Sequence, residues 1–310
     1  MPQNDTPAEV VIAKVPAPEP GVYPGVPFET YASWDAANAS LLKALDHTPA
    51  LALHRLTHIE DDKPHYALGR LFHLLATQPE LADGEFVEKP ATYVNDKGEE
   101  KPWHGGAKAC KAQMALWLSE GLTPVSADDM NQALAMADSV RTHEKLGPLM
   151  DGADVELSLV WVDTTTGVTC KARLDVAKTA AGVIGELKSA RSAKADDFFN
   201  VAYRLGYHIA TAMYVDAAIA LGLTPEDVPT WYVFAVVEKF PPYLARAFDV
   251  HDDPEALSFA FLDLGRKVYK TKLAEYAFCR KHNKWPGYPT EHADMMLPPW
   301  VKDAEAFEMR

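Results

Sequence analysis

The sequence has few cysteines and no pattern that would join them. Its three cysteines, Cys110, Cys170 and Cys279, lie far apart and form no Cys-x-x-Cys pair. This spacing argues against a zinc knuckle and against a disulfide framework. Most iron–sulfur clusters need four cysteine ligands, so we also expect no iron–sulfur cluster. The three residues are expected to be buried thiols.

Long apolar runs and positive charge are also scarce. The longest apolar stretches, such as 231–237, are far shorter than a bilayer span. The first residues lack the basic-then-apolar order of a secretory signal, so we expect a cytoplasmic protein with no membrane association. The net charge of −14 argues against nucleic acid wrapping the whole surface. A local basic channel remains compatible with it.

The order of the predicted elements indicates a mixed α/β fold, with a mostly antiparallel or mixed sheet flanked by helices. The proline-rich residues 1–22 are predicted to be a flexible lead-in to a single domain, 23–310. That domain divides into a helical part (about 33–145), a strand-rich core (about 154–250) and a C-terminal helix with a tail (about 253–310). We expect helices at 33–48, 66–77, 106–120, 126–145, 195–221 and 253–282, and strands at 155–162, 168–177, 183–188, 230–238 and 243–250.

Three residues of one predicted hairpin carry the clearest chemical signal. Glu186 and Lys188 are two apart on a strand, so they point to the same face, and Asp175 on the preceding strand can lie opposite Glu186. Close carboxylates repel each other, and hard oxygen ligands suit Mg²⁺ or Mn²⁺. Such ions clamp a phosphodiester and activate water. Lys188 can orient that water or neutralise charge on the phosphate.

The same triplet pattern also occurs where no site is expected. Residues 61–63 and 99–101 are acid-x-Lys triplets as well, and both lie in polar, loop-like stretches. Only the triplet at 186–188 ends an apolar strand after a hairpin with a second acid. On spacing alone, a surface cross-strand ion pair explains it as well as a metal site does.

Two further residues admit two interpretations each. Glu156, at the start of the first strand of the meander, is either an exposed strand residue or a third carboxylate of a two-metal site. His73, within an apolar helix, is either a hydrogen-bonded core residue or a metal ligand.

The helical segment 203–214 combines aromatic and basic side chains. Tyr207 and Tyr214 lie near one face, with Arg204 and His208 beside them. This face could bind phosphate and stack on a base, or it could belong to a packed helix with polar tips.

In their order along the chain, these motifs resemble those of the PD-(D/E)XK nuclease superfamily, and within it the RecE-type (exodeoxyribonuclease VIII-like) phage and prophage exonucleases. The similarity begins near Trp34. It comprises an opening helix (40–50), a G-x-x-x-H motif (69–73), an acidic entry to the sheet (156–158), a basic strand ending in the catalytic Asp (170–175), the E-x-K element (186–188) and two Trp/Pro segments (285–288 and 297–300).

The resemblance implies a restriction-endonuclease-like core and a metal-dependent exonuclease. Its catalytic residues would be Asp175, Glu186 and Lys188, and its Mg²⁺ ligands, with Mn²⁺ as a substitute, His73, Glu156, Asp175 and Glu186. The implied activity is 5′→3′ digestion of linear double-stranded DNA in phage-type recombination and DNA repair. A single-strand annealing recombinase would be the partner and a homo-oligomeric ring the assembly, in a bacterial or phage-infected cell. The alternatives are an endonuclease or repair nuclease of the same superfamily, or a DNA-end-binding protein with weakened catalysis.

A ring would let an acidic chain bind DNA, because basic groups need line only its channel. The expected DNA-binding residues are Arg173, Arg191, Arg204, Tyr207, His208 and Tyr214, with Lys171 and Lys194 as further channel candidates. One departure from the family is Ala210, which occupies the place of a glutamine. An alanine can neither donate to a phosphate nor orient a base, which bears on how the DNA end is handled.

Overall fold

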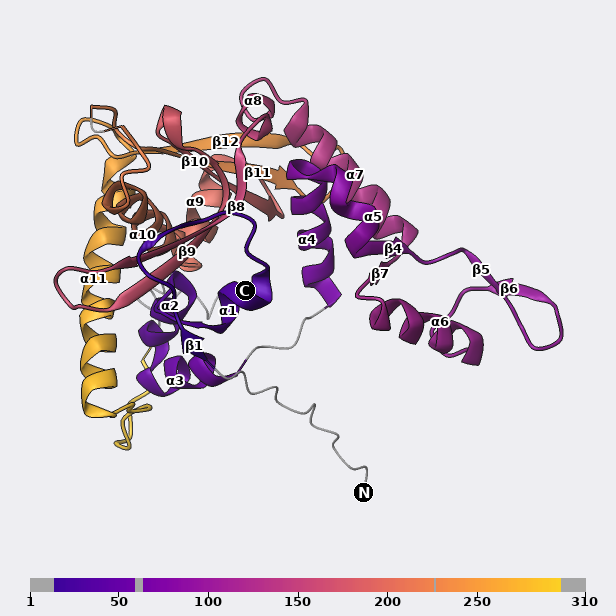
Figure 1. Cartoon of the computed structure of the whole chain (residues 1–310), viewed down its shortest axis with the longest axis horizontal. Coiled ribbons are helices and arrows are strands. Elements are labelled where there is room, and N and C mark those ends of the chain that lie inside the picture. The colour runs from indigo at the N-terminus through magenta and orange to yellow at the C-terminus, as the bar shows by residue number, and fades with distance from the viewer. Residues whose placement is uncertain (1–13, 59–63, 226, 297–310) are drawn as a thin grey trace, which may run out of the picture.

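A six-stranded sheet forms the centre of the molecule (Figure 1). The computed structural model describes residues 14–58, 64–225 and 227–296. In the sheet the strands run in the order β12-β11-β10-β9-β8-β2. β10 and β11 are parallel and every other neighbouring pair is antiparallel, which confirms the predicted mixed sheet and the β8–β10 meander. The strands are β2 (Gly21–Tyr23), β8 (Asp154–Val162), β9 (Thr169–Lys178), β10 (Val183–Ala190), β11 (Trp231–Glu238) and β12 (Ala245–His251).

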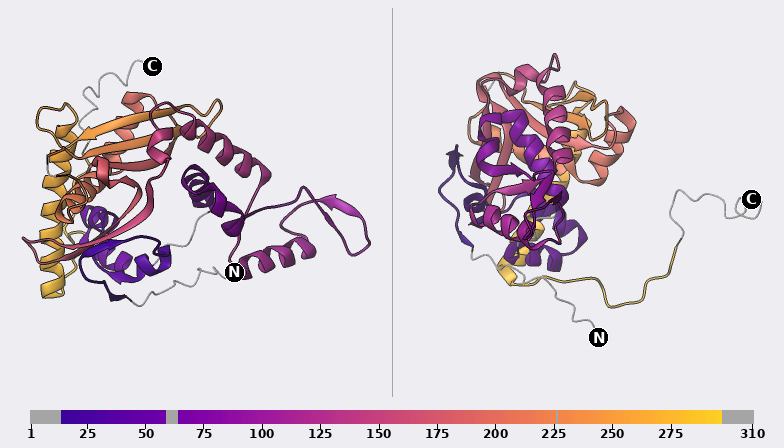
Figure 2. Two further views of the ribbon diagram at one scale, coloured as in Figure 1. Left: turned by 45° about the horizontal axis from the view of Figure 1, so that its top comes forward. Right: turned by 90° about the vertical axis from the view of Figure 1, so that its right-hand side faces the viewer.

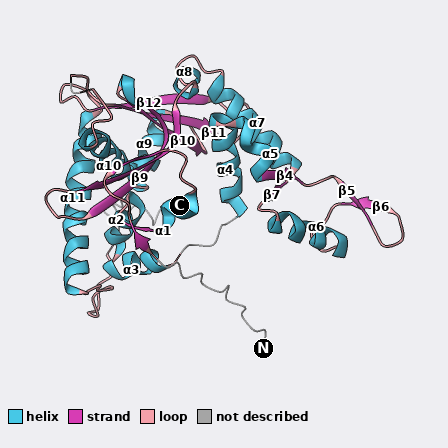
Figure 3. Cartoon of the chain, in the orientation of Figure 1, coloured by secondary structure: helices cyan, strands magenta, loops and turns pink. Residues whose placement is uncertain are grey.

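Helices cover both faces of this sheet (Figure 2, Figure 3). Side chains alternate along each strand, so Ile184 and Phe234 join the core under one set of helices, and Leu187 and Val233 join the core under the other. The first set is α2 (Ala39–His47), α9 (Ala195–Arg204), α10 (Tyr207–Ala220) and α11 (Phe259–His282), and the second is α4 (Pro64–Thr77) and α7 (Ala127–Arg141). Both faces are thus buried, as in an α/β sandwich.

An arm projects from the sheet and its helices between α4 and α7 (Figure 1). The predicted helix at 106–120 is α6, in which Trp117 stacks on Trp103 with ring centroids 5.7 Å apart. The arm consists of α5 (Ala82–Glu85), β4 (Phe86–Glu88), β5 (Thr92–Val94), β6 (Glu100–Pro102), α6 (Lys108–Ser119) and β7 (Thr123–Val125). The remaining short elements are β1 (Val15–Pro16), α1 (Phe28–Ser33), β3 (Trp34–Asp35), α3 (Pro49–Thr57), α8 (Gly147–Met150) and two 3-10 turns, Pro79–Leu81 and Thr179–Ala181.

Three of the predicted helices differ from the structure. The helix expected at 33–48 begins only at Ala39, after the strand β3. The single helix expected at 195–221 is two helices, because Gly206 adopts a left-handed φ of +66° that breaks the helical hydrogen bonding. The last helix begins at Phe259 rather than near 253, because Asp253 accepts a hydrogen bond from the Glu255 amide and forms a turn instead.

The N-terminal segment also contributes to the sheet. Residues 1–13 of the predicted lead-in lie outside the described residues, whereas Gly21–Tyr23 pairs with β8 as an edge strand. This stretch contains no proline, so its backbone amides are available for the pairing. None of the helices in the described part of the chain has the length and hydropathy of a membrane-spanning segment.

Candidate active site

Three carboxylates lie in one row across three neighbouring strands. In the β8–β9 ladder, Val155 pairs with Val176 and Leu157 with Leu174, which sets Glu156 opposite Asp175. The β9–β10 ladder ends at the pair Val176–Gly185, so the next position sets Asp175 against Glu186. Backbone pairing lapses at both places. Instead, the backbone amide of Leu187 donates a hydrogen bond to Asp175 Oδ2, at 2.9 Å. The sheet therefore opens where the acids meet.

The backbone of Glu156 is in an uncommon conformation for a strand. Its φ is +53°, a left-handed value that glycine adopts readily and that most other residues, apart from asparagine and aspartate, rarely adopt. Its carboxylate pairs with the Arg173 guanidinium, two residues before Asp175 on β9. Backbone strain of this kind is concentrated at functional sites, where the surrounding structure holds it.

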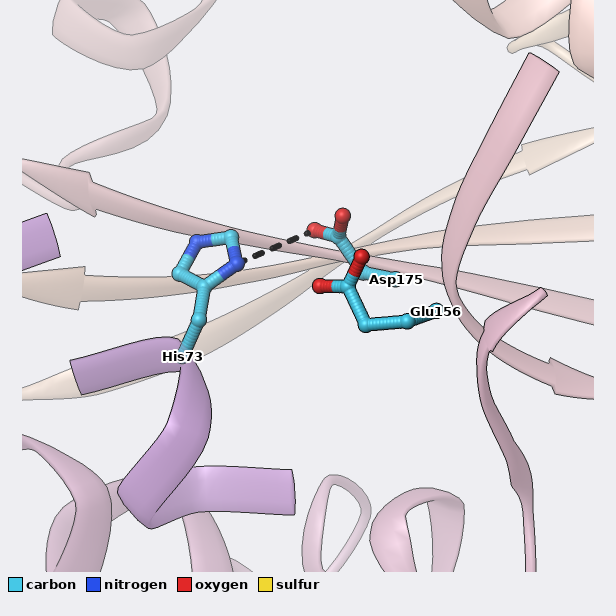
Figure 4. Close-up of side chains that lie close together, drawn as sticks. All are labelled: His73, Glu156 and Asp175. Carbon is cyan, nitrogen blue, oxygen red and sulfur yellow. Dashed lines mark ion pairs between the residues drawn. The ribbon is translucent and has the colours of Figure 1, made fainter. Parts of the chain in front are cut away.

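His73 reaches the same point from α4, on a different element (Figure 4). Ligand atoms of His73, Glu156 and Asp175 all lie within 4.8 Å of one another, and His73 Nδ1 is 3.6 Å from Asp175 Oδ2. Burial, followed by the nearby Lys188 charge, lowers the pKa of His73 to about 4. The imidazole is therefore neutral at pH 7, the form that binds a metal.

Asp175 lies beside a second carboxylate, that of Glu186. Burial and the Glu186 carboxylate raise the pKa of Asp175 well above its ordinary value. Among the described residues, Asp175 Oδ1 and Glu156 Oε1 accept no hydrogen bond. One imidazole nitrogen and several carboxylate oxygens with free lone pairs form a donor set that fits Mn²⁺ or Mg²⁺. A divalent cation would bind to these atoms and relieve the repulsion.

Glu186 is held beside this group by two donors. Its carboxylate accepts from the Lys188 ammonium and from the Tyr232 hydroxyl, which comes from β11. Burial alone would raise the pKa of Glu186, but Lys188 and Tyr232 bring the net shift downward. The same pairing raises the pKa of Lys188 against the effect of its own burial. Both groups are charged at neutral pH, and Glu186 is not among the three residues whose ligand atoms all lie within 4.8 Å of one another.

Five of the residues expected to bind DNA lie near the site or on the surface. Arg191 and Arg204 are exposed, as is Lys194. The Tyr207 ring lies beneath Lys188, with the ammonium 5.3 Å from its centroid. Tyr214 is half-buried, and its pKa is raised by burial and then by the Glu186 and other site carboxylates.

Arg173 is only partly available for DNA. Besides Glu156, it donates to the Val26 carbonyl at 2.6 Å and to the Ser158 hydroxyl at 3.2 Å. These bonds connect β9 to the segment between β2 and α1 and hold the Glu156 carboxylate in place. In this structure, the guanidinium therefore orients a site carboxylate.

Two of the residues expected to contact DNA are buried in this structure. Lys171 is 3% exposed and donates to the carbonyls of Tyr31 and Trp34 at 2.7 and 2.8 Å, because the chain of α1 and β3 crosses over it. It cannot line a channel. His208 is 6% exposed, stacked on Tyr203 and against Phe261, because α10 is buried on nearly all sides.

Two residues of the site carried no recognisable pattern in the sequence. Tyr232 lies within an apolar strand, where an aromatic residue is typical of core packing. Lys43 is on α2, and its ammonium interacts electrostatically with Glu186 and Lys188. The only sequence signal for Lys43 was its position in the segment that resembles the opening helix of the nuclease family.

A comparison with solved structures shows a similarity in fold. No curated protein matches the sequence significantly. Among solved structures, the chain is similar in fold to a protein from Eubacterium rectale described as a "putative exonuclease". The TM-score is 0.50 and the identity 15%, over 86% of this chain and 96% of the other.

A family profile covers most of the chain, including every residue of the site. The profile of the PDDEXK-like domain of unknown function, DUF3799, matches residues 38–297. The carboxylate row, the E-x-K element and the strands β8 to β12 of the sheet lie within that match. The chain therefore belongs to the DUF3799 family of PDDEXK-like domains.

Proposed function

We propose that this protein is a metal-dependent deoxyribonuclease that hydrolyses the phosphodiester bonds of linear double-stranded DNA from its ends. The observation that carries the proposal is the row Glu156–Asp175–Glu186, with His73 next to Asp175 and Lys188 paired with Glu186. Membership of the PDDEXK-like family supports a nuclease. The choice of an exonuclease is supported by the resemblance in motifs and by the description of the similar structure.

The chain's own residues prepare the reaction in distinct ways. A bound divalent cation would supply polarisation of the phosphate and activation of water. His73, Glu156 and Asp175 would hold it, with Glu186 adjacent. Lys188 has a raised pKa, so it stays an ammonium at neutral pH and serves as a donor to a phosphate oxygen rather than as a base. Tyr232 fixes Glu186 through its hydroxyl.

Several finer features remain proposals within this function. We propose 5′→3′ digestion, a single-strand annealing recombinase as the partner and a homo-oligomeric ring as the assembly. Exposed Arg191, Lys194 and Arg204 are the described cations that we expect to face DNA. Ala210 is 7% exposed and contributes no donor, so the DNA end must be bound by other groups.

The decisive test is a nuclease assay on linear duplex DNA with Mg²⁺ or Mn²⁺. Asp175→Asn and Lys188→Met should each lower the rate by about 10²-fold or more, as expected for loss of a group that acts in the transition state. Lys101→Met is the matched control, because Lys101 belongs to the exposed triplet 99–101 and pairs with Glu99 at 3.1 Å. Equal rates for the wild type and all three variants would end the proposal.

Covalently closed circular DNA tests the end requirement. An exonuclease leaves it intact, whereas an endonuclease of the same superfamily cuts it. Metal-dependent binding of DNA ends without cleavage, by a wild-type protein with a normal melting curve, would instead indicate a binding protein, which is the function that Ala210 favours.

A further inference from the structure

Lys43 and Lys188 approach the same aromatic ring from different elements. The ammonium of Lys188 is 5.3 Å from the centroid of Tyr207, and that of Lys43, on α2, is 5.8 Å from it. Lys43 also interacts electrostatically with Glu186. A second ammonium therefore lies at the edge of the carboxylate row, on a helix that contributes none of the proposed metal ligands.

The break between α9 and α10 makes room for this side chain. A Cβ at Gly206 would lie 3.0 Å from Lys43 Cδ and 3.3 Å from Cγ. The left-handed φ of +66° at Gly206 also favours glycine. The stem of Lys43 thus packs directly on the backbone of the break, and its position beside Tyr207 is fixed by packing rather than by an ion pair.

The ammonium of Lys43 has no ion pair or hydrogen bond among the described residues. Its side chain is half-buried. Asp46, one turn further along α2, pairs with Lys272 at 3.5 Å instead. Burial lowers the pKa of Lys43, Glu186 opposes that shift, and the like charges of Lys188 and Arg55 add to it. A partly desolvated ammonium without an ion pair or a hydrogen bond costs free energy that an anionic ligand would recover.

We infer that Lys43 binds a phosphate oxygen of the DNA strand held at the carboxylate row, at a phosphate next to the one that Lys188 contacts. The inference rests on the proposed function for its ligand. Lys43 would be a substrate-positioning residue and takes no part in binding the metal. Both ammonium groups lie near the ring of Tyr207, which places the two phosphate contacts side by side.

The test is DNA binding at several salt concentrations, with Ca²⁺ in place of Mg²⁺ and the integrity of the DNA checked on a gel. Lys43→Met keeps the aliphatic stem and removes the charge. We expect its Kd to rise about tenfold, and the slope of log Kd against log salt to fall by about 0.9, the value for one lost phosphate contact. Lys43→Arg should keep the wild-type slope.

Lys272→Met is the matched control, since Lys272 is also half-buried, with 20% of its side chain exposed, and contacts α2, but is already paired. It should leave the slope unchanged. Mn²⁺ affinity, measured by calorimetry without DNA, should stay the same or become tighter in Lys43→Met, because a positive charge near Glu186 has been removed.

An unchanged slope and Kd in Lys43→Met would overturn the inference, as would a loss of Mn²⁺ affinity. A loss of DNA affinity in Lys43→Arg equal to that in Lys43→Met would also overturn it, since charge would then be irrelevant. Duplexes with a 5′-phosphate or a 5′-hydroxyl locate the contact: a larger effect with the phosphate places it at the terminus, and an equal effect places it inside the strand. DNA binding is measured without cleavage, so a failure of the nuclease assay is distinguished from a failure of the inference about Lys43.

Discussion

Two clusters of charged side chains in this molecule contain similar groups but differ in how completely these are paired. In the first, on α10, α11 and the turn after β12, Arg266 donates to Asp252 at 2.6 and 2.7 Å and to Asp216 at 2.8 Å. Tyr269 donates to the other oxygen of Asp216. All four carboxylate oxygens are therefore occupied. We call these four residues the closed cluster.

In the second, the carboxylate row, oxygens remain available. Asp175 and Glu156 each keep one oxygen without a donor in the described part of the chain. Burial, followed by the nearby Glu186 carboxylate, raises the pKa of Asp175. The closed cluster is satisfied by the chain itself and ties three elements together. The row is satisfied only when something else binds, and this separates a structural charge cluster from a candidate metal site.

The largest expected effect on stability comes from opening the closed cluster. Arg266→Met would leave Asp216 and Asp252, which are only 19% and 17% exposed, without their shared partner. We expect a loss of about 3 kcal/mol in the free energy of unfolding, measured by urea denaturation. Arg280→Met is the control: Arg280 pairs with Asp35 but is 47% exposed, so its loss should cost less than about 1 kcal/mol. Equal losses for both would remove the distinction between a closed cluster and a surface pair.

In the carboxylate row, the expected change in the free energy of unfolding has the opposite sign. Asp175→Asn keeps an oxygen for the Leu187 amide and removes one of the repelling charges. In EDTA it should raise the free energy of unfolding by about 1 kcal/mol, because candidate catalytic groups are held at a cost to stability. Mn²⁺ should stabilise the wild type and not the variant, in thermal melts with and without the ion. A variant less stable than the wild type in EDTA would contradict this view of the row.

The pH dependence of that difference has a defined direction. The pKa of Asp175 is raised in the folded state, so the stability it contributes is present at low pH and is lost as pH rises through the folded pKa. The gain from Asp175→Asn in EDTA should therefore be small near pH 4 and grow toward pH 8. The stabilisation of the wild type by Mn²⁺ should grow over the same range, because the ion competes with the proton. Melts across this range measure both.

The row itself was predictable from the sequence because its geometry is local. The alternation of side chains and a short hairpin are enough to place Asp175 opposite Glu186 and Lys188 on the face of Glu186. The pairing of β8 with β9 brings in Glu156 in the same way. What the local pattern could not give was the left-handed φ of Glu156, which depends on the groups around it.

The residues that prediction missed or misplaced depend on contacts distant in the sequence. Lys171 and Arg173 are two apart on β9 and share a face, yet the backbone of α1 and β3 covers only Lys171 completely. The sequence places His208 beside Arg204 on one helix face. The break at Gly206 separates their helices, and α10 packs into the core with His208 buried. Tyr232 and Lys43 reach the site from elements whose positions only the folded chain defines.

The smallest expected effects compare one hydroxyl in each cluster. Tyr232 donates to Glu186 in the row and Tyr269 donates to Asp216 in the closed cluster, and both are buried. Tyr269→Phe should lower stability by about 1 kcal/mol without changing Mn²⁺ binding, because it removes a hydrogen bond from a structural group. Tyr232→Phe should instead weaken Mn²⁺ binding or the nuclease rate by severalfold, because Glu186 loses one of the two donors that orient it.

The two tyrosine variants are compared by urea denaturation and by Mn²⁺ titration. Since each change deletes a single oxygen atom at a buried site, a difference in outcome reports on the cluster rather than on the size of the change. If both variants lose stability alike and bind Mn²⁺ like the wild type, then Glu186 is as structural as Asp216. The free oxygens of Asp175 and Glu156 alone would then have to account for any metal site.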